Sequence, residues 1–467
     1  MIRPEETICA PATAVGGAIS IIRVSGSQCI DICDKIFFPS DKKLKLVEQK
    51  GFTIVFGDIR SGDEIIDEVL VSVFRAPHSY TGENSVEISC HASPYIIQKV
   101  LELLIFNGAI SAKPGEFTQR AFLNGKIDLS QAEAVADIIA STTKSAHRVA
   151  INQMRGGFSD EIEILRSELL NFASLIELEL DFGEEDVVFA DRNDLKKVII
   201  KVKELSDRLI DSFQLGNVLK NGLPVAIVGK PNSGKSTLLN ALLKEDKAIV
   251  SEIPGTTRDT IEDTIVIDGI EYRFIDTAGL RETTDVIEAM GIKKTHEKID
   301  QASVILLIDE ISDTTDAINN RIKTIREMIR ESDKRLLVLI NKIDKASPNQ
   351  QAEISDKIIL EENETLLFIS AKERSGLDDL RLKLSEVIVK EKLSSDNVII
   401  TNIRHYEALT QVSESIERVL IGLDNQIPED LIAIDIRQAI RYLGEITGEI
   451  TSDEILGNIF KNFCIGK

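Results

Sequence analysis

Residues 229–236 read GKPNSGKS, and this stretch decides the fold of the chain around it. Its spacing, Gly-x-x-x-x-Gly-Lys-Ser, is typical of a loop that cradles the phosphates of a nucleotide. The apolar run 225–228 before it has the pattern of a strand buried on both faces, and residues 237–243 after it have a helical pattern. A strand, a phosphate loop and a helix in this order predict a doubly wound α/β unit, which we place at residues 222–384.

The phosphate loop supplies several expected contacts. Gly229 and Gly234 let the backbone curl so that its N–H groups point at phosphate oxygens. Lys235 would reach the β and γ phosphates and is a candidate catalytic residue, and the hydroxyl of Ser236 is suited to Mg²⁺. The expected nucleotide contacts from this loop are Asn232, Ser233, Gly234, Lys235, Ser236 and Thr237.

Two short motifs after apolar strands indicate which base is bound. The sequence NKID at 341–344 follows the apolar run 336–340, and SAK at 370–372 follows the run 366–369. A carboxylate at Asp344 can accept from both the ring N–H and the exocyclic amine of guanine, whereas adenine presents neither donor on that edge. The expected guanine contacts are Asn341, Lys342, Asp344, Ser370, Ala371 and Lys372.

Two further segments have the composition of nucleotide switches. DTAG at 276–279 supplies a carboxylate that holds Mg²⁺ through water and a glycine N–H for the γ-phosphate, and 255–260 supplies hydroxyls and a loop that can close on it. Each motif alone is a weak signal. The four motifs GKPNSGKS, DTAG, NKID and SAK, in this order along the chain and each after a predicted strand, predict a Ras-like P-loop GTPase domain that binds GTP and Mg²⁺. The expected contacts are Ser251, Glu252, Ile253, Pro254, Gly255, Thr256, Thr257, Asp276, Thr277, Ala278 and Gly279.

The residue after the DTAG motif, at position 280, raises the question of how the attacking water is oriented. Many GTPases have glutamine there, whereas this chain has Leu280, which cannot orient water by hydrogen bonding. Glu282, Asp285 and Glu288 are the candidates, and spacing alone does not choose among them.

Composition bounds the remaining possibilities. A length of 467 residues suggests about three domains. The net charge of −22 disfavours broad contact with a nucleic-acid backbone, so an RNA partner would need a local patch or a second protein. Five cysteines without zinc-ligand spacing, no secretory signal and no apolar run of ~18 residues fit a cytoplasmic protein without membrane contact. Cys29 and Cys33 are best interpreted as core residues.

The texture of the chain changes along its length. Short apolar runs broken by glycine and proline predict an α+β domain at 1–124. Apolar residues that recur every three or four positions predict helices at 125–221. After 384 the α/β alternation stops and helices dominate. We therefore expect 125–221 and 385–467 to form one discontinuous helical domain into which 222–384 is inserted.

At this point the chain resembles a known family, the potassium-activated tRNA-modification GTPases of the MnmE (TrmE) type. The resemblance covers nearly the whole chain, and its most specific part is the C-terminal pentapeptide. It rests on Asn232 in the phosphate loop, GTTRD at 255–259, DTAGLRE at 276–282, FCIGK at 463–467, IRVSG at 22–26, SYTGE at 79–83 and PGEF at 114–117.

The resemblance implies an N-terminal domain that dimerises and binds 5-formyl-tetrahydrofolate or a relative through Arg23, Glu87, Lys126 and Lys467. It also implies that Ser236 and Thr257 hold Mg²⁺, that Glu288 orients the attacking water, and that K⁺ replaces an arginine finger. The K⁺ ligands would be Asn232, Ser251, Ile253 and Thr256. The same resemblance places Cys464 near the folate site, where it would act in the modification chemistry or hold an intermediate. The alternatives are a disordered tail and a prenylation box, which Gly466 and Lys467 fit poorly.

The implied activity is joint modification, with a flavin-dependent partner protein, of C5 of the wobble uridine in certain tRNAs. The product would carry an aminomethyl or carboxymethylaminomethyl group, and tRNA would be contacted mainly through the partner. One alternative is a regulatory ribosome-assembly GTPase that binds rRNA, but no basic run follows residue 384. A second is a folate-dependent one-carbon enzyme only loosely tied to the GTPase.

Overall fold

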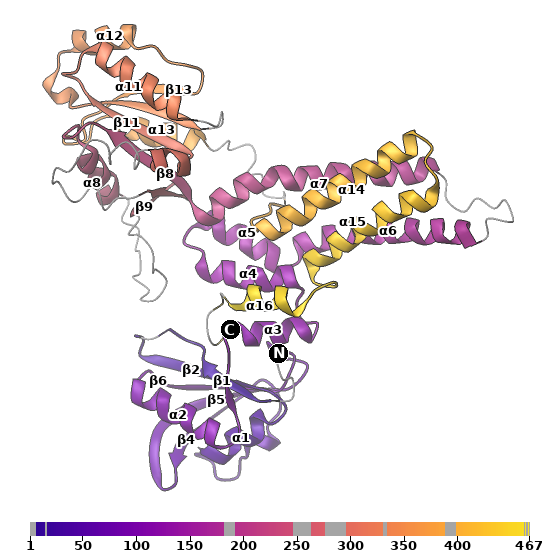
Figure 1. Ribbon diagram of the computed structural model, residues 1–467. Helices are drawn as coiled ribbons and strands as arrows, with labels where there is room; N and C mark the ends of the chain where they lie inside the picture. Colours follow the sequence, from indigo (N-terminus) through magenta and orange to yellow (C-terminus); the bar gives the residue numbers. More distant parts are fainter. Residues whose placement is uncertain are drawn as a thin grey trace. The chain divides into compact units, whose positions relative to one another are not determined.

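The computed structural model describes residues 6–14, 16–181, 192–245, 263–275, 296–329, 334–387, 398–461, 463 and 466. The chain divides into two compact units (Figure 1). The first comprises residues 1–140, 150–208 and 404–467, and the second comprises residues 141–149 and 209–403. Both units are therefore built from segments that are not continuous in sequence.

The first unit contains a seven-stranded sheet in the order β3-β4-β5-β6-β2-β1-β7. Its neighbours are antiparallel except for β1 and β7, which are parallel. The strands are β1 (Ile8–Pro11), β2 (Ile19–Ser25), β3 (Phe37–Pro39), β4 (Thr53–Ser61), β5 (Glu64–Phe74), β6 (Ser85–His91) and β7 (Ile110–Ser111).

Two helices, α1 (Cys29–Ile36) and α2 (Pro94–Phe106), share a core with one face of this sheet. Alternate residues of the strands, such as Val69, Val71 and Val73 of β5, point into that core, as a period of two requires. Cys29 and Cys33 are fully buried there, which confirms their interpretation as core residues.

The rest of the first unit is helical. A short 3-10 turn, η1 (Leu46–Glu48), lies in the α+β part. Figure 1 shows α6 beside α15 and α7 beside α14, and Asp207 on α7 accepts from Ser413 on α14 at 2.7 Å. The helices wholly in this unit are α3 (Glu116–Leu123), α4 (Leu129–Ala140), α6 (Gly157–Asp181), α15 (Glu429–Thr447) and α16 (Asp453–Lys461). Three more, α5 (Lys144–Met154), α7 (Arg192–Asn221) and α14 (Ile403–Asp424), also include residues of the second unit.

The second unit contains a six-stranded sheet in the order β13-β12-β11-β8-β10-β9, parallel except for β9. Its strands are β8 (Leu223–Gly229), β9 (Asp263–Ile267), β10 (Ile270–Phe274), β11 (Val304–Glu310), β12 (Arg335–Asn341) and β13 (Glu364–Phe368). Its helices are α8 (Lys235–Glu245), α11 (Thr315–Met328), α12 (Pro348–Lys357) and α13 (Leu377–Val387), with the 3-10 turn η2 (Ile343–Lys345).

Helices cover both faces of this sheet, which explains why the strands β8, β11 and β12 are largely apolar. Val225 and Ile227 of β8 belong to the core shared with α8 and α13, whereas Ala226 and Val228 belong to the core shared with α11 and α12. The doubly wound α/β fold predicted from the phosphate-loop stretch is confirmed. Parallel order brings the carboxyl ends of β8, β11, β12 and β13 to one edge of the sheet, where such folds bind ligands.

Among the described residues, none of the helices has the length and apolar character needed to span a membrane.

Candidate functional site

The phosphate loop follows β8 and passes close to the ends of two neighbouring strands. Gly229 has φ +148°, and a Cβ there would lie 2.3 Å from the carbonyl oxygen of Ile308 at the end of β11. Gly234 has φ +104°, and a Cβ there would lie 2.1 Å from Nδ2 of Asn341 at the end of β12. Both positions therefore require glycine, for backbone conformation and for space.

Lys235 begins α8 and points back over the loop. Its Nζ donates to the carbonyl oxygens of Gly229 at 2.8 Å and Lys230 at 2.7 Å. Burial, and then the charge of Lys298, lower the pKa of Lys235. The ammonium of Lys235 is thus held against the first two residues of the phosphate loop, whose N–H groups would bind phosphate. Ser236 beside it is half-buried, and Thr237 is exposed.

The side chain of Asn341, in the NKID motif, contacts both the phosphate loop and the SAK motif. This side chain is buried; Nδ2 donates to the carbonyl oxygen of Ser233 at 2.8 Å, and Oδ1 accepts from the backbone N–H of Ala371 at 3.0 Å. Stretches separated by more than 100 residues of sequence therefore meet in one place, as the predicted site requires. The predicted contact residues Ser233, Asn341 and Ala371 are brought together.

The carboxylate of Asp344 is oriented by Ser370, whose hydroxyl donates to Oδ1 at 2.6 Å. This hydrogen bond is the main reason that the pKa of Asp344 lies below its usual value. Asp344 is therefore ionised at neutral pH and able to accept from two donors on a base. Lys372 is exposed and pairs with the adjacent Glu373 at 3.3 Å.

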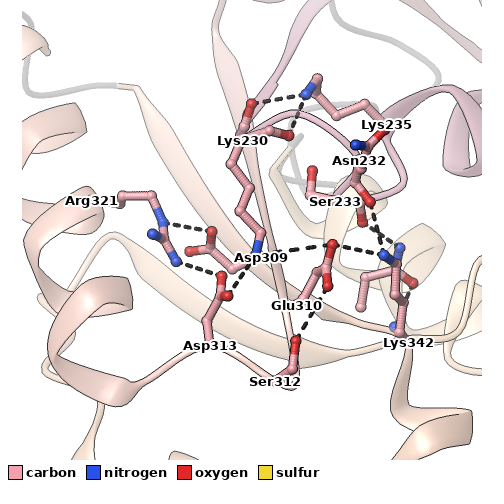
Figure 2. A network of polar contacts seen from close by, with 12 residues as sticks. Lys230, Asn232, Ser233, Lys235, Asp309, Glu310, Ser312, Asp313, Arg321 and Lys342 are labelled. Atoms are coloured by element: carbon pink, nitrogen blue, oxygen red, sulfur yellow. Dashed lines mark hydrogen bonds and ion pairs between the residues drawn. The ribbon is translucent and has the colours of Figure 1, made fainter.

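Lys342 crosses from the base-reading loop to the phosphate loop (Figure 2). Its backbone is left-handed, with φ +65°, and its Nζ donates to the carbonyl oxygen of Asn232 at 2.8 Å. The same Nζ lies 2.7 Å from Oε1 of Glu310. Asn232 itself is exposed, with φ +63°.

The remaining predicted residues of the nucleotide site lie outside the described residues. They are Ser251, Glu252, Ile253, Pro254, Gly255, Thr256, Thr257, Asp276, Thr277, Ala278, Gly279 and Glu288. Cys464 and Lys467 also lie outside them.

A second group of predicted residues lies in the first unit. Arg23 and Glu87 face each other on β2 and β6 and form an ion pair at 2.8 Å. The Arg23 guanidinium lies over the rings of Tyr80 and Phe117, at 5.2 and 5.7 Å from their centroids. Lys126 donates to the carbonyl oxygen of Pro77 at 3.1 Å.

The end of the chain reaches this group. Nη1 of Arg23 donates to the carbonyl oxygen of Gly466 at 3.4 Å, and a Cβ on Gly466 would lie 2.0 Å from the carbonyl oxygen of Pro11. The structure thus brings Gly466, two residues beyond Cys464, onto the start of the N-terminal sheet.

Sequence reasoning did not identify Glu310 or Lys230 as part of the nucleotide site. The available signal for Glu310 was its place at the end of an apolar strand, beside the strand that ends at Asn341. It also missed Arg120, which is buried and contacts both Glu83 and Glu116 at 3.2 Å. Nothing in a lone arginine on a helix signals such burial.

Comparison with known proteins now identifies the family. The sequence model described as the MnmE helical domain matches residues 129–464. The chain belongs to the MnmE family of tRNA modification GTPases. The expected family and the expected enzyme class, a GTP hydrolase, are thereby confirmed. The model described as the N-terminus of the GTP-binding protein TrmE matches residues 7–126.

Individual relatives in the MnmE family match along their whole length. The chain is 54% identical over 467 residues to the tRNA modification GTPase MnmE of Bacteroides thetaiotaomicron, covering 99% of this chain and 100% of that protein. It is 52% identical over 465 residues to the MnmE of Flavobacterium psychrophilum, covering 99% of each. Among solved structures, the G domain of the T. maritima FeoB iron transporter matches with 23% identity and a TM-score of 0.26, covering 35% of this chain and 98% of that one.

Proposed function

We propose that this chain couples GTP hydrolysis to modification of the wobble uridine in certain tRNAs. The observation that carries the proposal is the junction at Asn341, which brings the phosphate loop and both base-reading motifs together in a chain whose MnmE relatives match end to end. With a flavin-dependent partner protein, the product would be an aminomethyl or carboxymethylaminomethyl group at C5. Hydrolysis would drive a conformational change rather than the modification chemistry itself.

The described loop fits a nucleotide with its Mg²⁺. Gly229 and Gly234 leave the space that a Cβ would fill, which allows backbone N–H groups to approach phosphate. Ser236 follows Lys235 at the start of α8, where its hydroxyl, with that of Thr257, would hold Mg²⁺. The metal would neutralise charge that develops on the phosphate oxygens.

Potassium and the attacking water form the second part of the proposal. Asn232 is exposed on the phosphate loop, where its side chain can reach a cation. Together with Ser251, Ile253 and Thr256 it would hold K⁺ in place of an arginine finger. Leu280 cannot orient water, and among Glu282, Asp285 and Glu288 the resemblance to the MnmE family assigns that role to Glu288.

The first unit would bind a tetrahydrofolate and form a homodimer. Arg23, Glu87 and Lys126, with Lys467, would contact the folate; a guanidinium between two aromatic rings suits a planar anionic ligand. In support of a dimer, the sheet face opposite α1 and α2 exposes large apolar side chains. They are Phe38 (44% exposed), Ile54 (67%), Phe56 (50%) and Leu70 (47%).

We further propose three domains: residues 1–124 for folate binding and dimerisation, 125–221 with 385–467 as the helical domain, and 222–384 as the GTPase domain. A cytoplasmic location and contact with tRNA mainly through the partner fit the net charge of −22.

Mass spectrometry of wobble uridines in cells that lack this chain tests the function. Loss of the C5 modification, restored by the parent gene but not by Lys235→Ala, is expected. Normal modification together with unprocessed rRNA would instead favour the ribosome-assembly alternative. Folate turnover by the purified chain alone would favour the one-carbon alternative.

A further inference from the structure

Six charged side chains form a continuous network beside the phosphate loop (Figure 2). Positive and negative groups alternate along it, and its members come from the base-reading loop, the end of β11, the phosphate loop, the turn after β11 and α11. In order they are Lys342, Glu310, Lys230, Asp313, Arg321 and Asp309.

Glu310 lies between the two lysines of the nucleotide loops. Its Oε1 is 2.7 Å from Nζ of Lys342 and 4.0 Å from Nζ of Lys230. The pairing of β11 with β12 places Glu310 directly beside Asn341. The backbone that carries this carboxylate is thus paired with the strand that leads into the base-reading loop. Ser312 donates to its other oxygen at 3.2 Å. The hydrogen bond from Lys342 lowers the pKa of Glu310, which keeps it charged at neutral pH.

Asp313 and Arg321 complete the network on the other side of Lys230. Oδ1 of Asp313 accepts from Nζ of Lys230 at 2.6 Å, and Oδ2 accepts from Arg321 at 2.7 Å. Nε of Arg321 lies 2.7 Å from Asp309, a carboxylate that is fully buried. The side-chain ammonium of Lys230 is thereby linked, through Asp313 and Arg321, to α11, which packs on the sheet.

We infer that Glu310 and Asp313 are positioning residues that hold the phosphate loop and the base-reading loop at a fixed separation before nucleotide binds. The inference rests on the proposed nucleotide site and adds two residues to it. Lys342 is tied to the loop through the carbonyl of Asn232, and Lys230 belongs to the loop itself, so the carboxylate of Glu310 lies within ion-pair distance of both.

The physical consequence falls on affinity rather than on the chemical step. Without the negative charge of Glu310, two lysines that share one partner repel each other, and Lys342 loses the charged one of the two contacts that hold its Nζ. Nucleotide would then have to order both loops at the moment of binding, and that ordering subtracts from affinity. The contacts of Glu310 and Asp313 are with Lys342, Lys230, Ser312 and Arg321, to none of which we assign the γ-phosphate or Mg²⁺, so we expect turnover of bound GTP to change little.

Binding of a fluorescent GDP analogue to the full chain, with steady-state GTP turnover alongside, tests this inference. For Glu310→Gln we expect the Kd to rise about tenfold, mostly through faster dissociation, with kcat at saturating GTP within about threefold of the parent. Glu310→Asp keeps the charge on a shorter side chain and recovers part of the loss. Asp313→Asn, which acts through Lys230 and Arg321 and leaves Glu310 in place, raises the Kd about threefold and provides an independent reading if Glu310→Gln does not fold.

The matched control is Glu353→Gln on α12, which removes a carboxylate from an exposed pair with Lys357 and leaves the Kd unchanged. A Kd within twofold of the parent for both Glu310→Gln and Asp313→Asn overturns the inference. So does an equal fall in kcat and affinity with a lower Tm of the nucleotide-free protein, because that marks general structural damage. Failure of the parent chain to bind GDP would instead refute the nucleotide site, and the inference with it.

Discussion

Replacing Glu133 by glutamine should loosen the helical part of the first unit without affecting the nucleotide unit. Glu133 lies on α4 with its side chain 8% exposed, and Arg404 at the start of α14 donates to both of its oxygens, at 2.9 and 3.0 Å. Nε2 of His405 lies 2.7 Å from the same carboxylate. Arg404 also donates to the backbone carbonyl of Ile446 in the last turn of α15, so one carboxylate anchors three helices.

The size of the effect follows from the pKa of Glu133. Burial acts to raise it, but the charges and hydrogen bonds of His405 and Arg404 outweigh burial and lower it from 4.5 to about 2. A difference of about 2.5 pKa units corresponds to about 3 kcal/mol of stability. Removing one partner of a buried pair typically costs about 3–5 kcal/mol, which agrees.

The sign of the pH dependence follows from the same shift. Because the folded-state pKa is depressed, the stabilisation is fully present above the unfolded value of 4.5 and is lost as pH falls through about 2. Glu133→Gln should therefore cost about 3 kcal/mol at pH 7, and its difference from the parent should shrink between pH 4.5 and pH 2.

Hydrogen exchange followed by mass spectrometry suits this chain, because a single unfolding free energy is not defined for a protein with two units. Peptides from α4, α14 and α15 should exchange faster in Glu133→Gln, whereas those from β11 and β12 should match the parent. Glu417→Gln on the exposed face of α14 is the control. Unchanged protection of α14 at pH 7 would refute the reasoning, as would a destabilisation of equal size at pH 7 and pH 2.

Four further changes test the two predicted sites. Asp344→Asn should shift preference from GTP toward xanthosine triphosphate, with GTP affinity falling on the order of 10²-fold; unchanged GTP affinity would contradict the base-reading role. Gly234→Ala should abolish detectable nucleotide binding in calorimetry, because the new Cβ would lie 2.1 Å from Nδ2 of Asn341; binding within tenfold of the parent would contradict this geometry. GTP turnover should be faster in KCl than in matched NaCl, with Asn232→Ala removing most of the difference, and equal rates in the parent would reject a role for K⁺. Cys464→Ser should leave GTP turnover near the parent level yet strongly reduce wobble-uridine modification in complemented cells; normal modification would mean that the thiol has no part in the chemistry.

Local sequence pattern determined much of this protein. GKPNSGKS required a strand before it and a helix after it, and β8 and α8 are found there, because glycine placement and apolar runs act over a few residues. The order of the four motifs was enough to predict a GTPase, since each motif follows a strand whose end a doubly wound fold brings to one edge. The family was predicted from a resemblance over nearly the whole chain, most specifically at FCIGK, residues 463–467.

Only the tertiary structure decided which charged residues work together. Glu310, Lys230 and Asp313 look like ordinary surface charges in the sequence, and their roles arise from the parallel pairing of β11 with β12 and from the packing of α11. Glu133 and Arg404 are 271 residues apart, so no local pattern could reveal that they form one buried cluster. Local structure depends on neighbours in sequence. The free-energy contribution of a charged side chain depends instead on its burial and on partners that only the folded chain brings into contact.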